Sequence, residues 1–465
     1  MAGTPPIPEE LWNQLPPAAQ AAVLALVATL EARIAELEAR LNQNSSNSSR
    51  PPSSDPPSAK PAPPKTPSGK SKGGQRGHTK HSRPELPPDE VVELRADTCR
   101  HCRTPLTGSD SEPLRHQVIE IPPIRPHVTE YRQHRLTCPH CKRVTCAGLP
   151  PDVRGGYGPR VQSACALLSG AYRIGKRGVA QICKDLFGVP ISPAAVCDLQ
   201  HKTAEALAPI ATEAQAHVVG KPANVDETSW SEGRKRHWLW TAVTRAVSVF
   251  VIRPSRARKV LTELIPGPLG VLTTDRYSAY GHLPLTRRQV CWAHLRRDFQ
   301  AMIDRNDAGR RIGRELLSLA DDLLWRWKRV REGNASRDWF RRSDLSHLRP
   351  EVRLQLERGS ECGGVKTARV CRELLRIERA MYTFAYVEGV EPTNNAGERA
   401  VRHGVYWRKT STGTDSSRGS RFVERVLTVV ESCRQQARNI LAFLTQAIQA
   451  ARTKAKPPSL IPTNP

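Results

Sequence analysis

The sequence predicts a multidomain α/β protein, and three observations support this prediction. A chain of 465 residues is too long for one compact core. Between residues 221 and 299, β-rich runs alternate with helical patterns, which is typical of an α/β layer fold. Helical patterns fill residues 153–220 and 300–390, whereas proline and serine dominate 43–90. We therefore expect several folded units joined by an unstructured segment.

The charge of the chain indicates its class of partner. Lys and Arg number 71 against 45 Asp and Glu, a net charge of +26. This excess favours a polyanion, in the first place nucleic acid, because a basic surface needed only for solubility would explain far fewer charges. No apolar run approaches the ~20 residues of a membrane-spanning helix. The apolar segment Ala18–Leu30 is too short to span a membrane, and it follows Glu9 and Glu10, where a signal peptide would carry positive charge. We therefore expect a cytoplasmic protein without membrane contact.

Residues 1–42 are expected to form a coiled-coil helix. Apolar residues recur there at alternating spacings of four and three, with Glu and Arg on the outer positions: Val23, Val27, Leu30, Ile34, Leu37 and Leu41. This heptad seam predicts pairing with another helix and therefore a homo-oligomer. Because the seam is short, packing against the protein's own body is the alternative.

Residues 43–90 are predicted to be a disordered linker, since Ser, Pro, Gly and Lys leave little apolar surface to bury. Six basic residues lie within it: Lys60, Lys65, Lys70, Lys72, Arg76 and Lys80. Such a segment can hold DNA loosely, and a solvated spacer is an equal alternative.

Residues 91–152 are expected to form a zinc-binding domain. Two Cys-x-x-Cys pairs, Cys99 with Cys102 and Cys138 with Cys141, supply the four thiolates of a tetrahedral structural zinc site. The gap between the pairs is longer than in the commonest ribbon spacing, so unrelated cysteines are the alternative. Most other cysteines lie among apolar helical residues and are expected to be buried small hydrophobes: Cys165, Cys183, Cys197, Cys371 and Cys433.

Residues 153–220 read as helices, with one helix ending at Gly188 and the next opened by Ser192 and Pro193. Two helices joined by a short turn could form a DNA-reading helix-turn-helix, although ordinary helical hairpins are commoner. Three nearby basic residues favour the first reading: Arg173, Lys176 and Arg177.

The first part of the α/β domain, residues 221–299, carries two aspartates at strand positions. Three β-rich runs, 224–230, 237–244 and 246–252, are joined by linkers short enough for hairpins. A helix over 256–265 and strands over 270–274 and 288–292 are expected to follow. Asp226 lies on the first strand, and Asp275 directly follows the apolar strand VLTT. Adjacent parallel pairing of these two strands would set both carboxylates at one edge.

The second part, residues 391–450, contributes Glu398. Thr393, Asn394 and Asn395 are plausible caps of the helix that carries it. Three carboxylates from separate elements suit one or two Mg²⁺ (or Mn²⁺) ions, although a single Asp at a strand end is usually only solvated or capping. Glu227 is the competitor of Asp226, and in a strand its side chain points to the opposite face.

Residues 300–390 separate these two parts and read as a helical insertion. Trp325 and Trp327 could stack on DNA bases, but tryptophans on an amphipathic helix usually belong to the core. Four basic residues after Glu398 are placed to meet phosphates: Arg399, Arg402, Arg408 and Lys409. We expect a closing helix over 422–445 and a disordered tail over 451–465.

Long segments of the chain support a more specific identification. They are NQNSSNSSRPPSSD, the paired Cys-x-x-Cys knuckles, NVDETSW with HWLW, TTDRYSAY, RQVCWAHLRRDF, PTNNAGERAVR and GTDSSRGSRFVERVLTVVESCRQQARN. In this order, over most of the chain, they resemble the insertion sequence 66 family of bacterial DDE transposases. The resemblance implies a ribonuclease-H-like catalytic domain with Asp226, Asp275 and Glu398 as catalytic acids, and zinc at the four knuckle cysteines.

The resemblance also implies a reaction and its partners. Phosphodiester hydrolysis at each transposon end would expose a 3′-OH, which would then attack target DNA near the bacterial nucleoid, with accessory proteins of the same element. His294, within CWAH, is expected to support the metal site or the scissile phosphate, with a packing role as the alternative. Arg276 and Gly397 depart from the family pattern, and glycine weakens a helix. A non-catalytic zinc-containing DNA-binding derivative and another ribonuclease-H-like nuclease stay open as alternative functions.

Overall fold

The computed structural model describes residues 8–41, 43–45, 47–48, 55, 83–150, 153, 155–305 and 307–462. The chain divides into two compact units, one of residues 60–127 and the other of residues 1–59 together with 128–465. The six basic residues predicted to hold DNA in the linker lie outside the described residues. None of the helices in the described part of the chain combines the length and the apolarity needed to cross a membrane.

A five-stranded mixed sheet forms the centre of the larger unit, with the strand order β5-β4-β3-β6-β7. β4 is antiparallel to both of its neighbours, β3 and β5, whereas β6 and β7 run parallel to β3, which confirms the predicted succession of strands. The strands are β3 (Ala223–Glu232), β4 (Lys235–Val243), β5 (Ser248–Arg253), β6 (Leu272–Thr274) and β7 (Arg288–Val290).

The pairing of β3 with β6 decides where the two aspartates lie. Ala223 pairs with Leu272 and Asn224 with Thr273, in parallel. When this register is continued along both strands, Asp226 lies beside Asp275, which directly follows the last residue of β6. The predicted adjacency of the two carboxylate-bearing strands is therefore confirmed.

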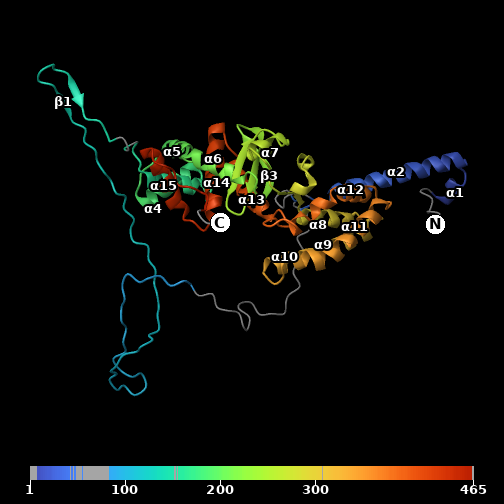
Figure 1. Cartoon of the computed structure of the whole chain (residues 1–465), viewed down its shortest axis with the longest axis horizontal. Coiled ribbons are helices and arrows are strands. Elements are labelled where there is room, and N and C mark those ends of the chain that lie inside the picture. Colours follow the sequence, from blue (N-terminus) through green and yellow to red (C-terminus); the bar gives the residue numbers. More distant parts are fainter. Residues whose placement is uncertain are drawn as a thin grey trace. The chain divides into compact units, whose positions relative to one another are not determined.

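Helices cover both faces of the sheet (Figure 1). On one face Trp230 and Leu239 pack against α13 (Asn395–Ser411) and α14 (Ser417–Gln435). On the other, Val225 and Trp240 belong to a larger core shared with α6 (Ala208–Val218) and α7 (Lys259–Leu264). Successive residues of β3 thus face different helices, as the alternation of a strand requires.

The free edge of β5 is closed by side chains of α14. The backbone N–H groups of Ser248, Phe250 and Ile252 donate to Ser432 Oγ at 3.0 Å, Thr428 Oγ1 at 3.2 Å and Glu424 Oε1 at 2.5 Å, respectively. The acceptors are spaced four residues apart and so lie on one helix face. This ladder satisfies donors that an open edge strand would leave without partners.

A run of four helices leads directly into β3: α3 (Pro159–Gly170), α4 (Lys176–Phe187), α5 (Pro193–Ala206) and α6. Gly188 ends α4 in the left-handed conformation at φ 63°, and the Ser192 hydroxyl accepts the Ala195 N–H at 3.1 Å, as the sequence predicts. The exposed face of α5 carries Asp198, paired with Lys202, and Glu205. Glu205 is paired in turn with Arg418 at 3.7 Å, and a DNA-reading role for α5 stays a prediction.

The segment between β7 and α13 is helical and has its own core, drawn in yellow to orange in Figure 1. Trp327 packs edge-on against Phe340 and Phe384 and is buried, whereas Trp325 is 60% exposed. The helices are α8 (Trp292–Asp304), α9 (Arg310–Arg331), α10 (Arg337–Trp339), the π-helical η4 (Phe340–Asp344), α11 (Leu345–Ser360) and α12 (Val365–Arg376). Two short 3-10 turns, η5 (Glu378–Met381) and η6 (Thr383–Ala385), end this segment, and two others, η2 (Ser278–Tyr280) and η3 (Leu285–Arg287), lie between β6 and β7.

Two predictions for the end of the chain are wrong. The closing helix is two helices, α14 and α15 (Ile440–Thr453), separated by a turn in which Ala437 has a φ of 52°. Residues 454–462 are no disordered tail, because Leu460 is fully buried and its N–H donates to Glu213 at 3.1 Å. The apolar pair Leu460 and Ile461 anchors this proline-rich segment on the main core.

The remaining described elements are short or exposed. α1 (Glu9–Trp12) and α2 (Pro17–Leu41) lie near the N-terminus, and β1 (Arg135–Thr137) pairs with β2 (Val144–Cys146). The seam of α2 is exposed from Leu30 to Leu41.

Candidate active site

Asp226 and Asp275 form the centre of the candidate site at the edge where β3 passes the end of β6. The Oδ1 atoms of both accept backbone N–H groups, Asp226 from Glu227 at 3.0 Å and Asp275 from Tyr277 at 2.8 Å. Burial raises the pKa of Asp226 well above its usual range, and the charges of Glu227, Asp275 and Glu398 raise that pKa further. The three predicted acids therefore share one electrostatic environment.

A buried asparagine fixes Glu398 relative to this edge. Asn394 is fully buried, and its Nδ2 donates to the carbonyl of Val225 at 2.9 Å while its Oδ1 accepts from Asn224 Nδ2 at 3.0 Å. Its backbone carbonyl accepts the Glu398 N–H at 3.0 Å. One residue thus joins the start of α13 to the strand that carries Asp226.

This arrangement corrects the expected capping role of Asn394. It is the N-cap residue of α13, but its side chain makes no capping hydrogen bond because β3 uses both of its polar atoms. A Cβ on Gly397 would lie 2.9 Å from Asn394 Oδ1. Glycine at this position gives the Asn394 side chain room, which explains the residue that departs from the family pattern.

The side chain of Glu398 lies among three residues of the β7–α8 connection. Its Oε1 is 3.5 Å from His294 Nδ1 and 3.4 Å from an Arg297 nitrogen. Donor atoms of Cys291, His294 and Glu398 all lie within 4.8 Å of one another, and among the described residues Asp226 and Asp275 do not belong to that group. Burial, followed by the charge of Arg297, lowers the pKa of His294. A neutral imidazole beside the Glu398 carboxylate is the result.

Glu227 is occupied on the other face of β3. Its carboxylate accepts from Arg256 Nε at 2.8 Å and from the hydroxyl of Tyr280. Burial raises the pKa of Glu227, and the charge of Asp275 raises it further. Both oxygens of Glu227 therefore have partners within the protein.

The free donors fit a hard divalent cation. Asp226, Asp275 and Glu398 offer carboxylate oxygens, the ligands that Mg²⁺ and Mn²⁺ take. Their mutual repulsion adds to burial in raising the pKa of Asp226, and a cation between them would relieve it. The buried Nδ1 of His294 has no hydrogen-bond partner among the described residues, so the site also has an unused nitrogen donor.

Comparisons with known proteins identify the family. The model of the IS66 transposase family matches residues 154–421, more than half of the chain. The chain belongs to the IS66 transposase family. The zinc-finger binding domain of IS66 transposases matches residues 96–142, and a family of unknown function matches residues 7–84.

One curated relative aligns with part of this IS66 family member. The uncharacterized protein y4qI of Sinorhizobium fredii (strain NBRC 101917 / NGR234) is 26% identical over 234 residues, which cover 45% of this chain and 43% of the relative. The chain thus spans less than half the length of the curated relative that it matches.

The two Cys-x-x-Cys knuckles of the IS66 zinc finger have the same local geometry. In the first, Cys99 N–H donates to Thr104 and Arg103 N–H to Cys99, each at 2.9 Å. In the second, Cys138 N–H donates to Arg143 and Lys142 N–H to Cys138, again at 2.9 Å. Arg103 and Lys142 both have a φ of 60°. Repetition of one tight turn at both pairs is not expected of unrelated cysteines.

Thiolate formation is favoured in both knuckles. Hydrogen bonds to Thr104 lower the pKa of Cys102 to about 7, and backbone N–H groups of Cys141 and His140 lower the pKa of Cys138. Since metals bind the thiolate, this fits the zinc-binding character of the family domain.

The predicted DNA-contacting residues fall into two groups. Five are exposed: Lys176 and Arg177 on α4, and Arg399, Arg402 and Lys409 on α13. Two are engaged within the protein. Arg408 donates to the Ser229 carbonyl at 2.9 Å, and Arg173 donates to His403 Nδ1 at 3.3 Å. The exposed group is free to meet phosphates, whereas the engaged group would first have to break internal hydrogen bonds.

Several residues of the site carry no distinct signal in the sequence. Asn224 and Asn394 lie 170 residues apart and could not be paired without the fold. Arg297 follows the CWAH segment by one helical turn, so its helical spacing from His294 could have suggested a shared face. Arg256 and Tyr280 could have been linked to Glu227 only through knowledge of which face of β3 it occupies.

Proposed function

We propose that this chain is a DDE transposase that hydrolyses a phosphodiester at each transposon end and transfers the resulting 3′-OH into target DNA. The observation that carries the proposal is the gathering of Asp226, Asp275 and Glu398 into one electrostatic cluster from three separate elements. The sheet order, with three antiparallel strands followed by two parallel to the first, supports a ribonuclease-H-like catalytic domain.

Asp226, Asp275 and Glu398 would hold one or two Mg²⁺ or Mn²⁺ ions. Such ions activate an attacking oxygen and stabilise the leaving oxygen in an in-line displacement at phosphorus. Water is the nucleophile of the first step and the 3′-OH of the second, so no covalent bond to the protein forms. The protein's part is to bring the three carboxylates to one place, where a bound cation would favour their ionised form.

Neighbouring residues would orient these groups. An Arg297 nitrogen lies 3.4 Å from Glu398 Oε1, and a neutral His294 with its proton on Nδ1 would donate to the same oxygen, 3.5 Å away. Asn394 sets the distance between the start of α13 and β3 through its two side-chain hydrogen bonds. Displacement of any of them would misplace Glu398 rather than remove it.

Binding of DNA is proposed to involve the exposed basic residues of α4 and α13. The zinc finger is proposed to hold one structural Zn²⁺ at Cys99, Cys102, Cys138 and Cys141. The family match over 96–142 spans both cysteine pairs. Accessory proteins of the same element are further proposed partners.

Self-association through α2 is proposed because its seam exposes Leu30, Ile34 and Leu41 by 52%, 55% and 77%. Light scattering of the full chain against a variant without residues 1–42 would test it, and equal masses would contradict it.

A non-catalytic, transposase-derived DNA-binding protein would keep the zinc finger and the basic residues but would not need the carboxylate cluster. Another ribonuclease-H-like nuclease would cleave without joining ends. Strand-transfer products distinguish the transposase from both.

The test is cleavage of DNA ends flanking the chain's own gene, with Mg²⁺. Asp226→Asn, Asp275→Asn and Glu398→Gln are each expected to reduce strand cleavage at least ~100-fold while end binding stays within about threefold, because charge stabilisation at phosphorus is lost but the DNA-contacting surface is kept. Asp298→Asn, which removes a nearby carboxylate paired with Arg276, is the matched control. Robust cleavage by any of the three acid variants would refute the assignment.

A further inference from the structure

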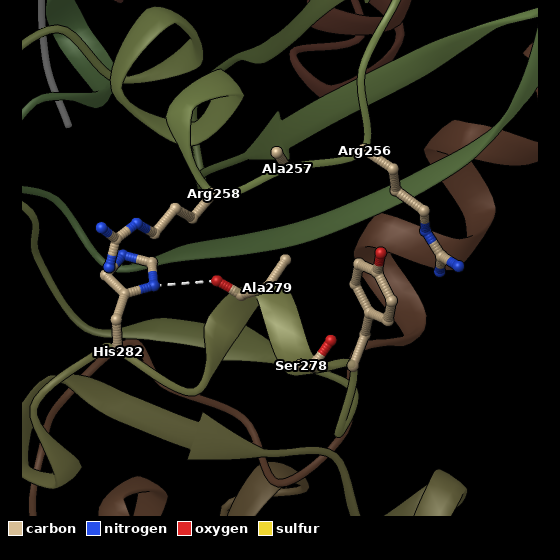
Figure 2. A pocket seen from close by; sticks show the side chains of 7 residues that line it. Arg256, Ala257, Arg258, Ser278, Ala279 and His282 are labelled. Atoms are coloured by element: carbon tan, nitrogen blue, oxygen red, sulfur yellow. Dashed lines mark hydrogen bonds between the residues drawn. The ribbon is translucent and has the colours of Figure 1, made fainter.

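A pocket lies beside the carboxylate cluster and has no part in the proposed chemistry so far. Its volume is about 390 Å³, and it is lined by Arg256, Ala257, Arg258, Tyr277, Ser278, Ala279 and His282. Figure 2 shows Arg258 and His282 at one end and Arg256 at the other, with the turn of Ser278 and Ala279 between them. The volume is within the ~300–1,000 Å³ of sites that bind small organic groups.

Two contacts connect the pocket to the candidate active site. The N–H of Tyr277, a lining residue, donates to Asp275 Oδ1 at 2.8 Å. Arg256, another lining residue, binds Glu227, the neighbour of Asp226, with a nitrogen 2.6 Å from Oε1. The pocket therefore lies next to Asp275 and next to the residue that follows Asp226 in the chain.

The lining has the chemistry of an anion site with an aromatic wall. Its residues carry two guanidinium groups, an imidazole, a serine hydroxyl and a phenol, and no lining residue is acidic. Arg256 is held in place by Glu227 and by the Tyr277 ring, whose centroid is 3.7 Å from its Cζ. Arg258 is exposed, and among the described residues its side chain has no ion pair or hydrogen-bond partner. Its positive charge is therefore available to a ligand.

We infer that this pocket binds one nucleotide of the DNA strand next to the scissile phosphate. Arg258 and the Ser278 hydroxyl would contact its phosphate, because guanidinium and hydroxyl groups are the usual donors to phosphate oxygens. Tyr277 would pack against its sugar or base, as aromatic side chains do in single-strand binding sites. A free anion would satisfy only the charged part of the lining, whereas a nucleotide also uses the aromatic wall. The inference rests on the proposed function.

Photochemical crosslinking tests the location without requiring cleavage. The Asp226→Asn protein is mixed with duplex DNA carrying the end that flanks the chain's own gene, and thymines near the cleavage position are replaced one at a time by 5-iododeoxyuridine. We expect one position to crosslink to the 277–282 segment, with a yield that falls at least ~5-fold in Arg258→Ala and recovers in Arg258→Lys.

Arg245→Ala is the matched control, because Arg245 is equally exposed but lies in the turn between β4 and β5, outside the pocket. It should leave the crosslink unchanged. Crosslinks that avoid the 277–282 segment at every substituted position would overturn the inference, even if the wild-type protein cleaves normally. A crosslink at that segment in a protein that never cleaves DNA would keep the pocket and refute the transposase.

A substrate with a neutral linkage tests the phosphate contact. Methylphosphonates replace single phosphates in the end DNA, and cleavage by wild type and Arg258→Ala is compared. At one position we expect the neutral linkage and the variant each to reduce cleavage ~10-fold, and their combination to cost no more than either alone, as for partners in one interaction. If the reductions in cleavage caused by the neutral linkage and by Arg258→Ala multiplied at every position, the contact between Arg258 and a phosphate would be contradicted.

Discussion

At the scale of single residues, Asn394 gives the clearest test of how the site is held together. Asn394→Ala removes two buried hydrogen bonds to β3 and should lower the free energy of unfolding by about 1–3 kcal/mol. It should also reduce kcat for cleavage more than it weakens DNA binding, because Glu398 shifts relative to Asp226. Chemical denaturation and single-turnover cleavage measure the two effects.

Two variants separate positioning from general loss of stability. Asn395→Ala alters the exposed neighbour and should change neither quantity. Asn394→Asp can still accept from Asn224 but cannot donate to Val225, so its kcat should lie between wild type and Asn394→Ala. A kcat for Asn394→Ala equal to that of the wild type would show that the hydrogen bonds between Asn394 and β3 have only a structural role.

His403 gives a residue-scale prediction about pH. Burial, followed by the charges of Arg434, Arg173 and Arg402, lowers its pKa from 6.5 to about 4, and Glu431 Oε2 lies 3.2 Å from its Nε2. A lowered histidine pKa contributes stability that is fully present above pH 6.5 and is lost as the pH falls towards 4. Burial raises the pKa of Glu431, which has the opposite effect on stability.

The Tm of His403→Gln should therefore fall less than that of the wild type between pH 6.5 and 4. Calorimetry at a series of pH values measures the difference. His347→Gln, at an exposed histidine, should follow the wild-type curve. Parallel curves for wild type and His403→Gln would show that this histidine does not titrate against folding.

At the scale of elements, α14 shows why a helix can be found in the sequence while its role cannot. Its apolar residues predict a helix that packs on the sheet, and this is correct. Glu424, Thr428 and Ser432 form a polar row at helical spacing, but only the fold shows that the row meets the N–H groups of β5. The succession of strands and the two hairpins followed from β-rich runs and short linkers, because these are local signals, whereas the parallel pairing of β3 with β6 could only be supposed. The hydrogen bonds of Asn394 to β3 and those of α14 to the edge of β5 join residues more than 160 positions apart. Such contacts leave no local signal in the sequence.

The edge ladder predicts the effect of a nearly isosteric change. Thr428→Val keeps the shape of the side chain but leaves the Phe250 N–H without its acceptor, so it should lower the free energy of unfolding by about 1–3 kcal/mol. Thr453→Val is the control, because that exposed hydroxyl bonds only to carbonyls of its own helix. Urea unfolding that gives equal values for both variants would contradict a stabilising role for the ladder.

At the scale of the whole molecule, the family matches describe individual domains, whereas the net charge is a property of the entire chain. The IS66 match covers the sheet and the helices from α3 to α13, and the zinc-finger match covers both pairs of knuckle cysteines. The net charge of +26 extends over the whole chain, so binding to DNA should weaken steeply with salt whatever the state of the active site. Cleavage and binding can therefore be lost separately.

The zinc finger gives the last prediction. The purified chain should carry one zinc ion, and Cys138→Ser should lose it, because the repeated turn geometry and the lowered pKa of Cys138 mark a thiolate prepared for metal. Cys146→Ser is the matched control: Cys146 is an exposed cysteine at the end of β2, outside both pairs, and its removal should leave the zinc content unchanged. Elemental analysis and native mass spectrometry measure the metal. If Cys146→Ser lost zinc as fully as Cys138→Ser, the two Cys-x-x-Cys pairs would not be the complete ligand set.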